Sequence, residues 1–227
     1  MNSTTEIDKL RKEEPWRLFR IMGEFVEGFD ALPKYVPCVT VFGSSRVPEE
    51  HPYYQLSYRV GRELGQRGYT VLTGGGPGTM EAVNRGAYEA GAQSIGLNIW
   101  LPHEQVANRY TTESMRFRYF FVRKVMLVKY STAFFLLPGG FGTLDELFET
   151  LTLIQTQKVR PFPVILMGVR FCEGLLNWIR SALVKERMIS PEELDIFRSQ
   201  LDVAGQFSGA RGIWVLWDGE RYVRQEG

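Results

Sequence analysis

The chain has 227 residues, of which 44% are apolar and 23% charged, and its formal net charge at neutral pH is +1. These values are typical of a globular protein with a sizeable core, and so small a charge argues against a nucleic-acid partner. Two cysteines, two histidines and the lack of a long apolar stretch predict no metal site, no membrane partner and a cytoplasmic location.

The first predicted element is a helix that begins at Pro15. Residues 1–14 are largely polar or charged, and we expect them to be frayed. Apolar residues then recur at helical spacing, namely Trp16, Phe19, Ile21, Met22, Phe25, Val26 and Phe29. We expect this N-terminal helical extension, residues 1–37, to cover either the main domain or a second subunit.

From residue 38 onward, apolar strands alternate with helices. The expected strands are 38–45, 69–76, 93–99, 117–121, 132–138 and 162–168. The expected helices are 53–67, 79–90, 122–130, one that follows the strand 132–138, and 172–187. Residues 100–115 are expected to form a long functional loop, and Asp218-Gly219 predicts a terminal hairpin. The alternation predicts an α/β fold, a doubly wound parallel sheet with helices on both faces, in a single domain over residues 38–227.

Two predicted strand-to-helix turns have nearly the same sequence. TGGGPGTMEA occupies residues 73–82, and LPGGFGTLDE occupies residues 137–146. Glycine lets backbone N–H groups approach a ligand, and the helix that follows directs its free N–H groups and positive dipole end to the same place. Two such turns at the carboxyl edge of one sheet favour an anion site, with phosphate as the usual occupant, over turns that only shape the chain.

Neither turn fits the two standard nucleotide-binding patterns. The GxGxxG pattern needs a glycine where this chain has Thr79, and the Gly-Lys-Ser/Thr of the Walker A motif is absent. A dinucleotide oxidoreductase and an ATP-hydrolysing P-loop protein therefore lose support.

Three charged residues near the turns allow two interpretations each. Glu146 follows Thr143 at the spacing of a capping box, so its role is either to cap a helix or to act on a ligand. Arg123 and Lys124 fall in the first turn of a predicted helix, where cations oppose the helix dipole. A nearby anion or carboxylate would offset that cost, and the alternative is that both side chains point into solvent.

The segments PGGFGTLDE, VRKVM and GGGPGTMEA together resemble the LOG family, the "lysine decarboxylase-like" group named for the cytokinin-activating phosphoribohydrolase of plants. Residues 138–146 match every fixed position of the family pattern P-G-G-x-G-T-x-x-E, and Arg123-Lys124 match its Arg-Lys pair. The chain looks like the longer bacterial subgroup, because it reads GTME where plant members are closer to GLMG. Lysine decarboxylation itself is disfavoured, since no lysine has a recognisable setting for a pyridoxal Schiff base.

The resemblance implies a Rossmann-like nucleotide-binding domain that forms a homodimer or larger homo-oligomer. The implied reaction is hydrolysis of the N-glycosidic bond of a nucleoside 5′-monophosphate, of the AMP or N6-modified AMP type, without a cofactor. Arg123 and Glu146 correspond to the family's catalytic pair. We assign phosphate or nucleotide binding to Gly139, Gly140, Gly142, Thr143, Gly75, Gly76, Gly78, Thr79, Lys124, Glu81 and Ser44.

Two questions stay open at the level of sequence. A non-catalytic nucleotide sensor or carrier on the same fold would keep the glycine turns and lose the Arg/Glu pair, whereas this chain has Arg123 and Glu146. Glycosidases commonly use a second carboxyl group as general acid. The candidates for that role are Glu81 and the 100–115 loop with His103, Glu104 and Arg109.

Overall fold

Six strands form one parallel sheet in the order β4-β3-β2-β1-β5-β6. The computed structural model describes residues 3–101, 107–191, 193, 216–217 and 222–223. The strands are β1 (Cys38–Phe42), β2 (Thr70–Thr73), β3 (Ser94–Ile99), β4 (Glu113–Phe117), β5 (Ser131–Leu136) and β6 (Val164–Leu166). Every neighbouring pair in this sheet runs parallel, as the alternation of strands and helices predicts.

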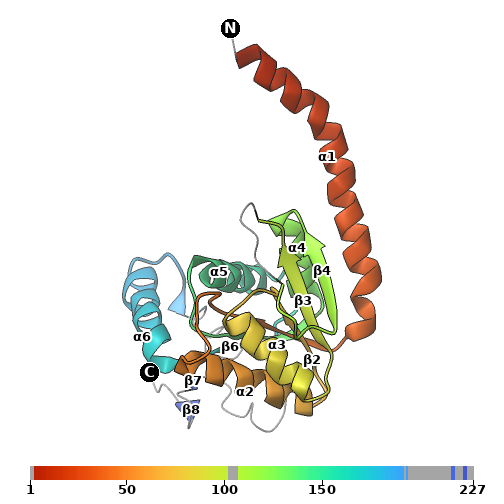
Figure 1. The fold of residues 1–227 in the computed structure, drawn as a ribbon. Coiled ribbons are helices and arrows are strands. Elements are labelled where there is room, and N and C mark those ends of the chain that lie inside the picture. Colours follow the sequence, from red (N-terminus) through yellow and green to blue (C-terminus); the bar gives the residue numbers. More distant parts are fainter. Residues whose placement is uncertain (1–2, 102–106, 192, 194–215, 218–221, 224–227) are drawn as a thin grey trace.

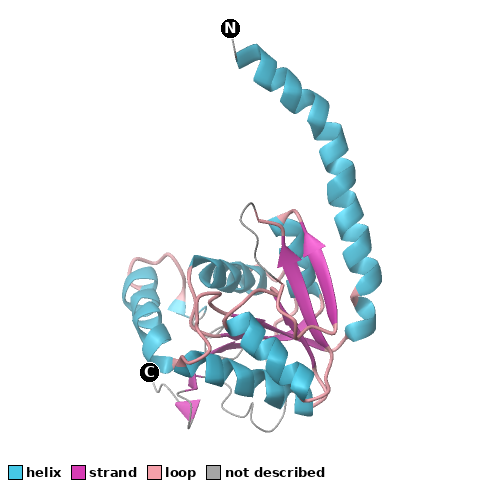
Figure 2. Ribbon diagram, in the orientation of Figure 1, coloured by secondary structure: helices cyan, strands magenta, loops and turns pink. Residues whose placement is uncertain are grey.

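Helices cover both faces of the sheet (Figure 2). They are α1 (Ser3–Ala31), α2 (Pro52–Gln66), α3 (Thr79–Glu89), α4 (Phe120–Lys129), α5 (Phe141–Gln155) and α6 (Val169–Trp178), which continues as a π-helical segment over Ile179–Val184. A short 3₁₀ helix, η1 (Pro33–Tyr35), joins α1 to the sheet. A small antiparallel pair, β7 (Leu216–Trp217) and β8 (Tyr222–Val223), lies where a hairpin was expected, although Asp218-Gly219 fall outside the described residues.

The two sides of the sheet have separate apolar cores. One contains side chains of α2 and α3, such as Leu56, Val60 and Val83, packed on alternate residues of the strands. The other contains side chains of α4 and α5, such as Met126 and Leu147. Burial on both faces explains why apolar residues predominate along the central strands, and it makes the fold a doubly wound, Rossmann-like one.

The N-terminal helix divides its apolar residues between two directions. Ile21 and Phe25 pack against the core on the α4 side, and Glu24 accepts the backbone N–H groups of Arg118 and Tyr119 just before α4. A second row of apolar residues stays at the surface, with exposed fractions from 42% to 68%: Trp16, Phe19, Met22, Val26 and Phe29. The helix therefore packs on the rest of the fold with only part of its apolar surface, and its N-terminal end extends away from the other elements (Figure 1).

Two predicted boundaries are wrong. Helix α1 begins at Ser3 and not at Pro15, because residues 3–14 are rich in strong helix formers such as Glu, Lys and Arg. The expected strand over 117–121 lies instead at Glu113–Phe117, inside the segment expected to be loop, and Phe120 already begins α4. As an edge strand, β4 buries only Met115 and Phe117 and so lacks the continuous apolar run of a central strand.

The sheet order places a topological switch point between β1 and β5. The chain moves outward in one direction from β1 to β4, then returns to add β5 and β6 on the other side of β1. The carboxyl ends of β1 and β5 are therefore neighbours whose following helices pack on opposite faces, which is where doubly wound proteins bind ligands.

Candidate functional site

A cavity of about 630 Å³ lies at this switch point. It is bounded by the turn after β1, by Gly74 after β2, by α4 and by the beginning of α5. Its apolar walls include Phe42, Met80, Ile99, Leu101, Phe120 and Phe141. Such a volume lies within the usual range of small-molecule sites.

The second glycine turn opens directly into the cavity. Gly140 is the N-cap of α5 and Phe141 its first residue, and Gly140, Gly142 and Thr143 line the cavity. Among the described residues no side chain caps this helix and no backbone group accepts the N–H groups of Phe141 and Gly142, which are left for solvent or a ligand. Gly139 lies behind the turn, where a Cβ atom would come within 2.1 Å of Thr143 Oγ1. The arrangement provides an anion site at a helix N-terminus.

The first glycine turn is arranged differently. Gly75 and Gly78 have left-handed backbone angles, with φ of 69° and 68°, a region that favours glycine. Gly74 and Met80 line the cavity, whereas the predicted ligand contacts Gly75, Gly76, Gly78 and Thr79 do not. The structure therefore does not present the two turns to the cavity in the same way.

Ser44 joins the two turns through its backbone. Its N–H donates to the carbonyl oxygen of Pro138 at 3.1 Å, and its own carbonyl oxygen accepts the N–H of Thr79 at 2.9 Å. The preceding residue, Gly43, leaves no room for a side chain, because a Cβ atom there would lie 2.3 Å from Thr79 Cγ2. Ser44 also lines the cavity, as expected of a predicted site residue.

Glu146 lies on the cavity wall and is 4% exposed. The capping-box interpretation is wrong, because α5 begins at Phe141 and the N–H of Thr143 donates to the carbonyl of Gly140 instead. Glu146 Oε2 has no hydrogen-bond partner among the described residues. Burial raises the pKa of this carboxyl to about 7, and Lys124 and Arg123 oppose the rise. A carboxyl with such a pKa exchanges protons readily near neutral pH.

Arg123, on α4, also lines the cavity. Its Nη1 donates to the carbonyl oxygen of Leu97 at 3.5 Å, and its guanidinium carbon lies 5.4 Å from the ring centre of Phe120. Its Nε has no partner among the described residues. Burial lowers the pKa of Arg123 and the charge of Glu146 raises it. The structure thus brings the predicted catalytic pair to one cavity.

Lys124 points toward α5 and is not among the residues that line the cavity. Its Nζ lies 2.8 Å from Asp145 Oδ2 and 2.5 Å from Glu149 Oε2. These carboxylates offset the cost of a cation early in α4. Of the two interpretations of Lys124, this supports a nearby carboxylate over a side chain that points into solvent. With its ammonium bound to two carboxylates, Lys124 is poorly placed for a Schiff base or for direct contact with a ligand.

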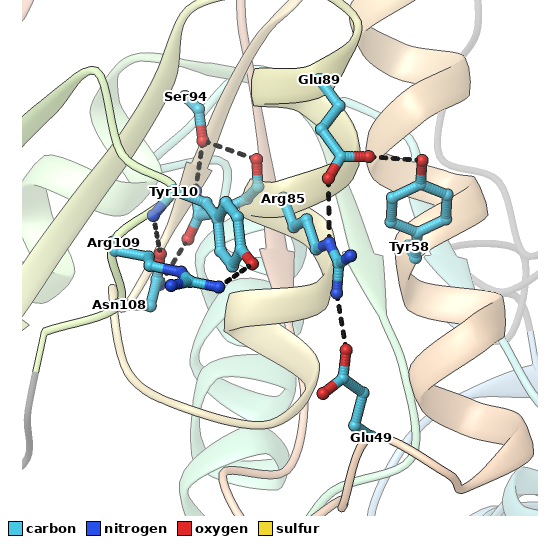
Figure 3. A network of polar contacts seen from close by, with 9 residues as sticks. Glu49, Tyr58, Arg85, Glu89, Ser94, Asn108, Arg109 and Tyr110 are labelled. Carbon is cyan, nitrogen blue, oxygen red and sulfur yellow. Dashed lines mark hydrogen bonds and ion pairs between the residues drawn. The ribbon is translucent and has the colours of Figure 1, made fainter.

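The other candidates lie away from the cavity lining. Glu81 is half-buried on α3 and does not line the cavity. Arg109 belongs to a surface network in which it donates to the hydroxyl of Tyr110 at 2.9 Å (Figure 3). In the same network Arg85 pairs with Glu49 and Glu89. His103 and Glu104 fall outside the described residues.

Sequence reasoning missed several residues of the cavity. Arg46 is exposed at its rim, and Phe141 is 91% exposed although it begins α5. Arg46 carries no motif signal, but its place two residues after Ser44 beyond a central strand is a position from which ligands are contacted in this fold. Phe141 is the variable residue of the second turn, which a pattern search passes over.

Two features are absent from the described residues, a metal-binding cluster and a membrane-spanning helix. Within the described part of the chain, no cluster of three or more His, Cys, Asp or Glu side chains is arranged to hold a metal ion. Among the same residues, no helix is both long and apolar enough to cross a membrane.

Comparisons with known proteins agree with this architecture. The family model described as "Possible lysine decarboxylase" matches residues 80–207. The cytokinin riboside 5′-monophosphate phosphoribohydrolase LOG3 of Arabidopsis thaliana is 32% identical over 71% of this chain and 75% of its own length. The probable cytokinin riboside 5′-monophosphate phosphoribohydrolase LOGL5 of Oryza sativa subsp. japonica is 33% identical over 67% of this chain and 63% of its own length.

Solved structures give weaker matches. The structural-genomics target TM1055 is 30% identical, with a TM-score of 0.46 over 56% of this chain and 71% of that chain. The molybdenum cofactor binding protein of Rippkaea orientalis is 23% identical, with a TM-score of 0.47 over 61% of this chain and 80% of that chain. At these TM-scores neither likeness bears on function.

A doubly wound parallel sheet with a glycine-rich turn at its switch point defines a Rossmann-like α/β protein. The chain belongs to the LOG family, the group whose model is described as "Possible lysine decarboxylase". Its curated relatives are phosphoribohydrolases of cytokinin riboside 5′-monophosphates.

Proposed function

We propose that this protein hydrolyses the N-glycosidic bond of a nucleoside 5′-monophosphate, of the AMP or N6-modified AMP type, to the free base and ribose 5-phosphate. The observation that carries the proposal is the buried carboxyl of Glu146, whose Oε2 has no hydrogen-bond partner among the described residues, on the wall of a cavity that also contains the N-terminus of α5. The names of the curated relatives support the same reaction.

The 5′-phosphate is proposed to bind at Gly140, Gly142 and Thr143. The first-turn N–H groups of α5 and the positive end of its dipole favour a dianion there. Holding this non-reacting group fixes the sugar relative to Glu146, so binding energy lowers the barrier of the chemical step. In this assignment the remaining predicted contacts at Gly139, Gly75, Gly76, Gly78 and Thr79 shape the site without touching the phosphate.

Glu146 is proposed to act at the sugar carbon that carries the base. As the bond between C1′ and the base nitrogen breaks, positive charge develops on the sugar, and ionised Glu146 stabilises it and takes a proton from the attacking water. The oxygen of water joins C1′, and its two hydrogen atoms end on the new sugar hydroxyl and on the base. The positive charge of Arg123 lowers the pKa of Glu146 and so favours the ionised form of this carboxyl.

The walls of the cavity suit a flat, weakly polar base. Phe120 and Phe141 are 52% and 91% exposed at the cavity and offer ring faces, while Ile99 and Leu101 offer aliphatic contacts. An N6-alkyl group on adenine would add apolar area to such contacts. We therefore propose purine monophosphates, including N6-modified AMP, as substrates.

The direct test is to incubate the purified chain with AMP, N6-isopentenyl-AMP, GMP and CMP and to separate the products by chromatography. We expect free base and ribose 5-phosphate from an adenine nucleotide, and no base from adenosine at the same concentration, because adenosine lacks the phosphate. Thermal stabilisation by AMP without any product would contradict the proposal and favour a nucleotide sensor or carrier.

The proposal includes assembly into a homodimer or a larger homo-oligomer. Exposed apolar residues of α4 lie near the outward row of apolar residues on α1: Phe121 and Val125 are 47% and 40% exposed, and Phe25, which is 5.6 Å from Phe29 of the row, lies 6.5 Å from Phe121 between ring centres. Contiguous apolar surface of this kind marks interfaces. A second copy of this chain presents the same surface and is the proposed occupant.

A further inference from the structure

We propose that the first glycine turn is not a second phosphate site but a seat that positions the guanidinium of Arg123. The expected effect of this seat on catalysis rests on the proposed function. The positioning of the Arg123 guanidinium by the turn does not, because it is argued from contacts alone. It assigns Gly74 and Asn108 as positioning residues, a role that neither the motifs nor the predicted site gives them.

Gly74 is the contact between the turn and Arg123. A Cβ atom added to Gly74 would lie 3.3 Å from Arg123 Nη1 and 2.9 Å from Met80 Sδ. The guanidinium therefore lies against the bare backbone of residue 74, between the turn and the ring of Phe120. Together with the carbonyl of Leu97, which accepts from Nη1, these groups define where the charge of Arg123 lies.

Three backbone groups of Gly75 and Gly76 have hydrogen-bond partners within the protein. The N–H of Gly75 donates to Thr73 Oγ1 at 2.9 Å. The carbonyl oxygen of Gly75 accepts the N–H of Asn108 at 3.0 Å, and that of Gly76 accepts Asn108 Nδ2 at 3.2 Å. A phosphate binds N–H donors, and in this turn the N–H of Gly75 is taken by Thr73 and that of Thr79 by the carbonyl oxygen of Ser44, whereas the N–H groups of Phe141 and Gly142 at the start of α5 have no backbone partner among the described residues.

A buried polar network holds Asn108 in place. Its Nδ2 also donates to Asn84 Oδ1 at 3.0 Å, and the same Oδ1 accepts Thr73 Oγ1 at 2.6 Å. The amide of Asn84 in turn donates to Ser94 Oγ at 2.8 Å. Figure 3 shows Ser94 and Asn108 at this network, beside the Arg85 cluster. Fully satisfied networks of buried polar groups rigidify what they hold, which here is the first glycine turn.

The main test is the substitution Gly74→Ala. Gly74 is not among the glycines with positive φ, so alanine is compatible with its backbone, and Met80 has a flexible end that yields. The added methyl group crowds Arg123 Nη1. We expect kcat for AMP hydrolysis to fall roughly tenfold to a hundredfold, the scale of a small misplacement of a catalytic group, with KM changed less than about twofold. Gly23→Ala, on α1 with open space around it, is the control that leaves kcat unchanged.

A double-mutant cycle separates positioning from general damage. If Gly74 acts through Arg123, Gly74→Ala adds little to the loss caused by Arg123→Gln, and Asn108→Ala behaves in the same way. Full additivity of the losses in a folded double variant would overturn the seat, because it would mean that Gly74 affects the reaction by another route.

A structural readout keeps the test independent of the proposed function. Crystal structures of the wild type, Gly74→Ala and Asn108→Ala are compared at Arg123. A displaced guanidinium in both variants supports the seat even if the wild type proves not to hydrolyse any nucleotide, in which case only the proposed function fails. An unmoved guanidinium in both variants overturns the seat whatever the activity.

Discussion

The ammonium of Lys124 on α4 lies 2.8 Å from the carboxylate of Asp145 on α5, and the same ammonium binds Glu149 one turn further along. Glu146 lies between these two carboxylates in the sequence of α5. Burial works against the charged form of Lys124, yet its two partners hold its pKa above the usual value. Lys124 thus places a fixed positive charge behind Glu146 without entering the cavity.

The first prediction concerns Lys124→Met. Because Lys124 lowers the pKa of Glu146, its loss raises that pKa further above about 7. Because activity requires ionised Glu146, kcat increases with pH as this carboxyl loses its proton. In the variant this increase occurs at higher pH, and kcat at neutral pH falls several-fold. The measurement is the pH profile of kcat. Lys129→Met, at the other end of α4, is the matched control and should leave the profile in place; an unshifted profile for Lys124→Met contradicts the prediction.

The second prediction concerns Glu146→Gln. Removing the carboxylate should lower the rate of nucleotide hydrolysis on the order of a hundredfold or more, the scale of acid–base contributions. Circular dichroism should show unchanged secondary structure, since no capping box depends on Glu146. Near-wild-type turnover by a folded Gln variant would end the catalytic assignment.

The same variant predicts a pH-dependent gain in stability. The folded pKa of Glu146, about 7, exceeds its ordinary value of 4.5. The unfolded chain therefore releases this proton more easily, so wild-type stability falls as pH rises from about 4.5 to about 7 and the whole penalty is present above that window. It amounts at most to the order of 3 kcal/mol. We expect Glu146→Gln to melt at higher temperature than the wild type at pH 8 and at nearly the same temperature at pH 4.5; equal offsets at both pH values would contradict this.

The third prediction concerns Arg46→Ala. Arg46 is an exposed cation at the rim of the cavity, two residues after Ser44. Removing it should raise KM for AMP by several-fold, up to about tenfold, with little change in kcat, since an exposed charge assists binding more than chemistry. The effect should weaken in high salt, as expected for a screened interaction. Arg59→Ala, an exposed arginine on α2, is the control, and an equal KM effect there would refute a specific role.

The fourth prediction concerns the outward face of α1. Replacing both Phe19 and Val26 by serine should lower the molar mass measured by light scattering to that of a smaller assembly, because apolar contacts between copies are lost. Serine at the polar positions Arg20 and Glu27 of the same helix is the control. An unchanged mass for the Phe19/Val26 variant would place the interface elsewhere.

The order of strands and helices could be predicted because the central strands are buried on both faces and are therefore rich in apolar residues. The edge strand β4 escaped because it buries only alternate residues, Met115 and Phe117, among charged ones. The position of Glu146 next to the second turn was also readable, since the helix that follows a strand begins near its glycine turn. Its role in capping was misread because Gly140 and Thr143 are both plausible starts for α5, and only tertiary packing selects Gly140.

The unequal roles of the two turns could not be predicted. Their sequences are nearly identical, and the difference comes from Asn108, which lies far along the chain and binds the carbonyls of Gly75 and Gly76. Likewise, the partners of Lys124 belong to a helix about one strand later in the sequence. Contacts between distant segments carry no local pattern, so motif similarity alone overstated the likeness of the two turns.

What the two turns do share is a threonine that packs tightly against a glycine. Gly43 meets Thr79, and Gly139 meets Thr143, at distances that no Cβ atom tolerates. The threonine that both sequences contain therefore brings a helix close to a strand end in each turn. Gly43 lies outside both repeated sequences, yet it is as constrained as Gly139. A library that mutates every codon of this gene should find both positions nearly closed to substitution, including by alanine, while the solvent-facing Gly140 and Gly142 tolerate alanine as far as abundance in the cell is concerned.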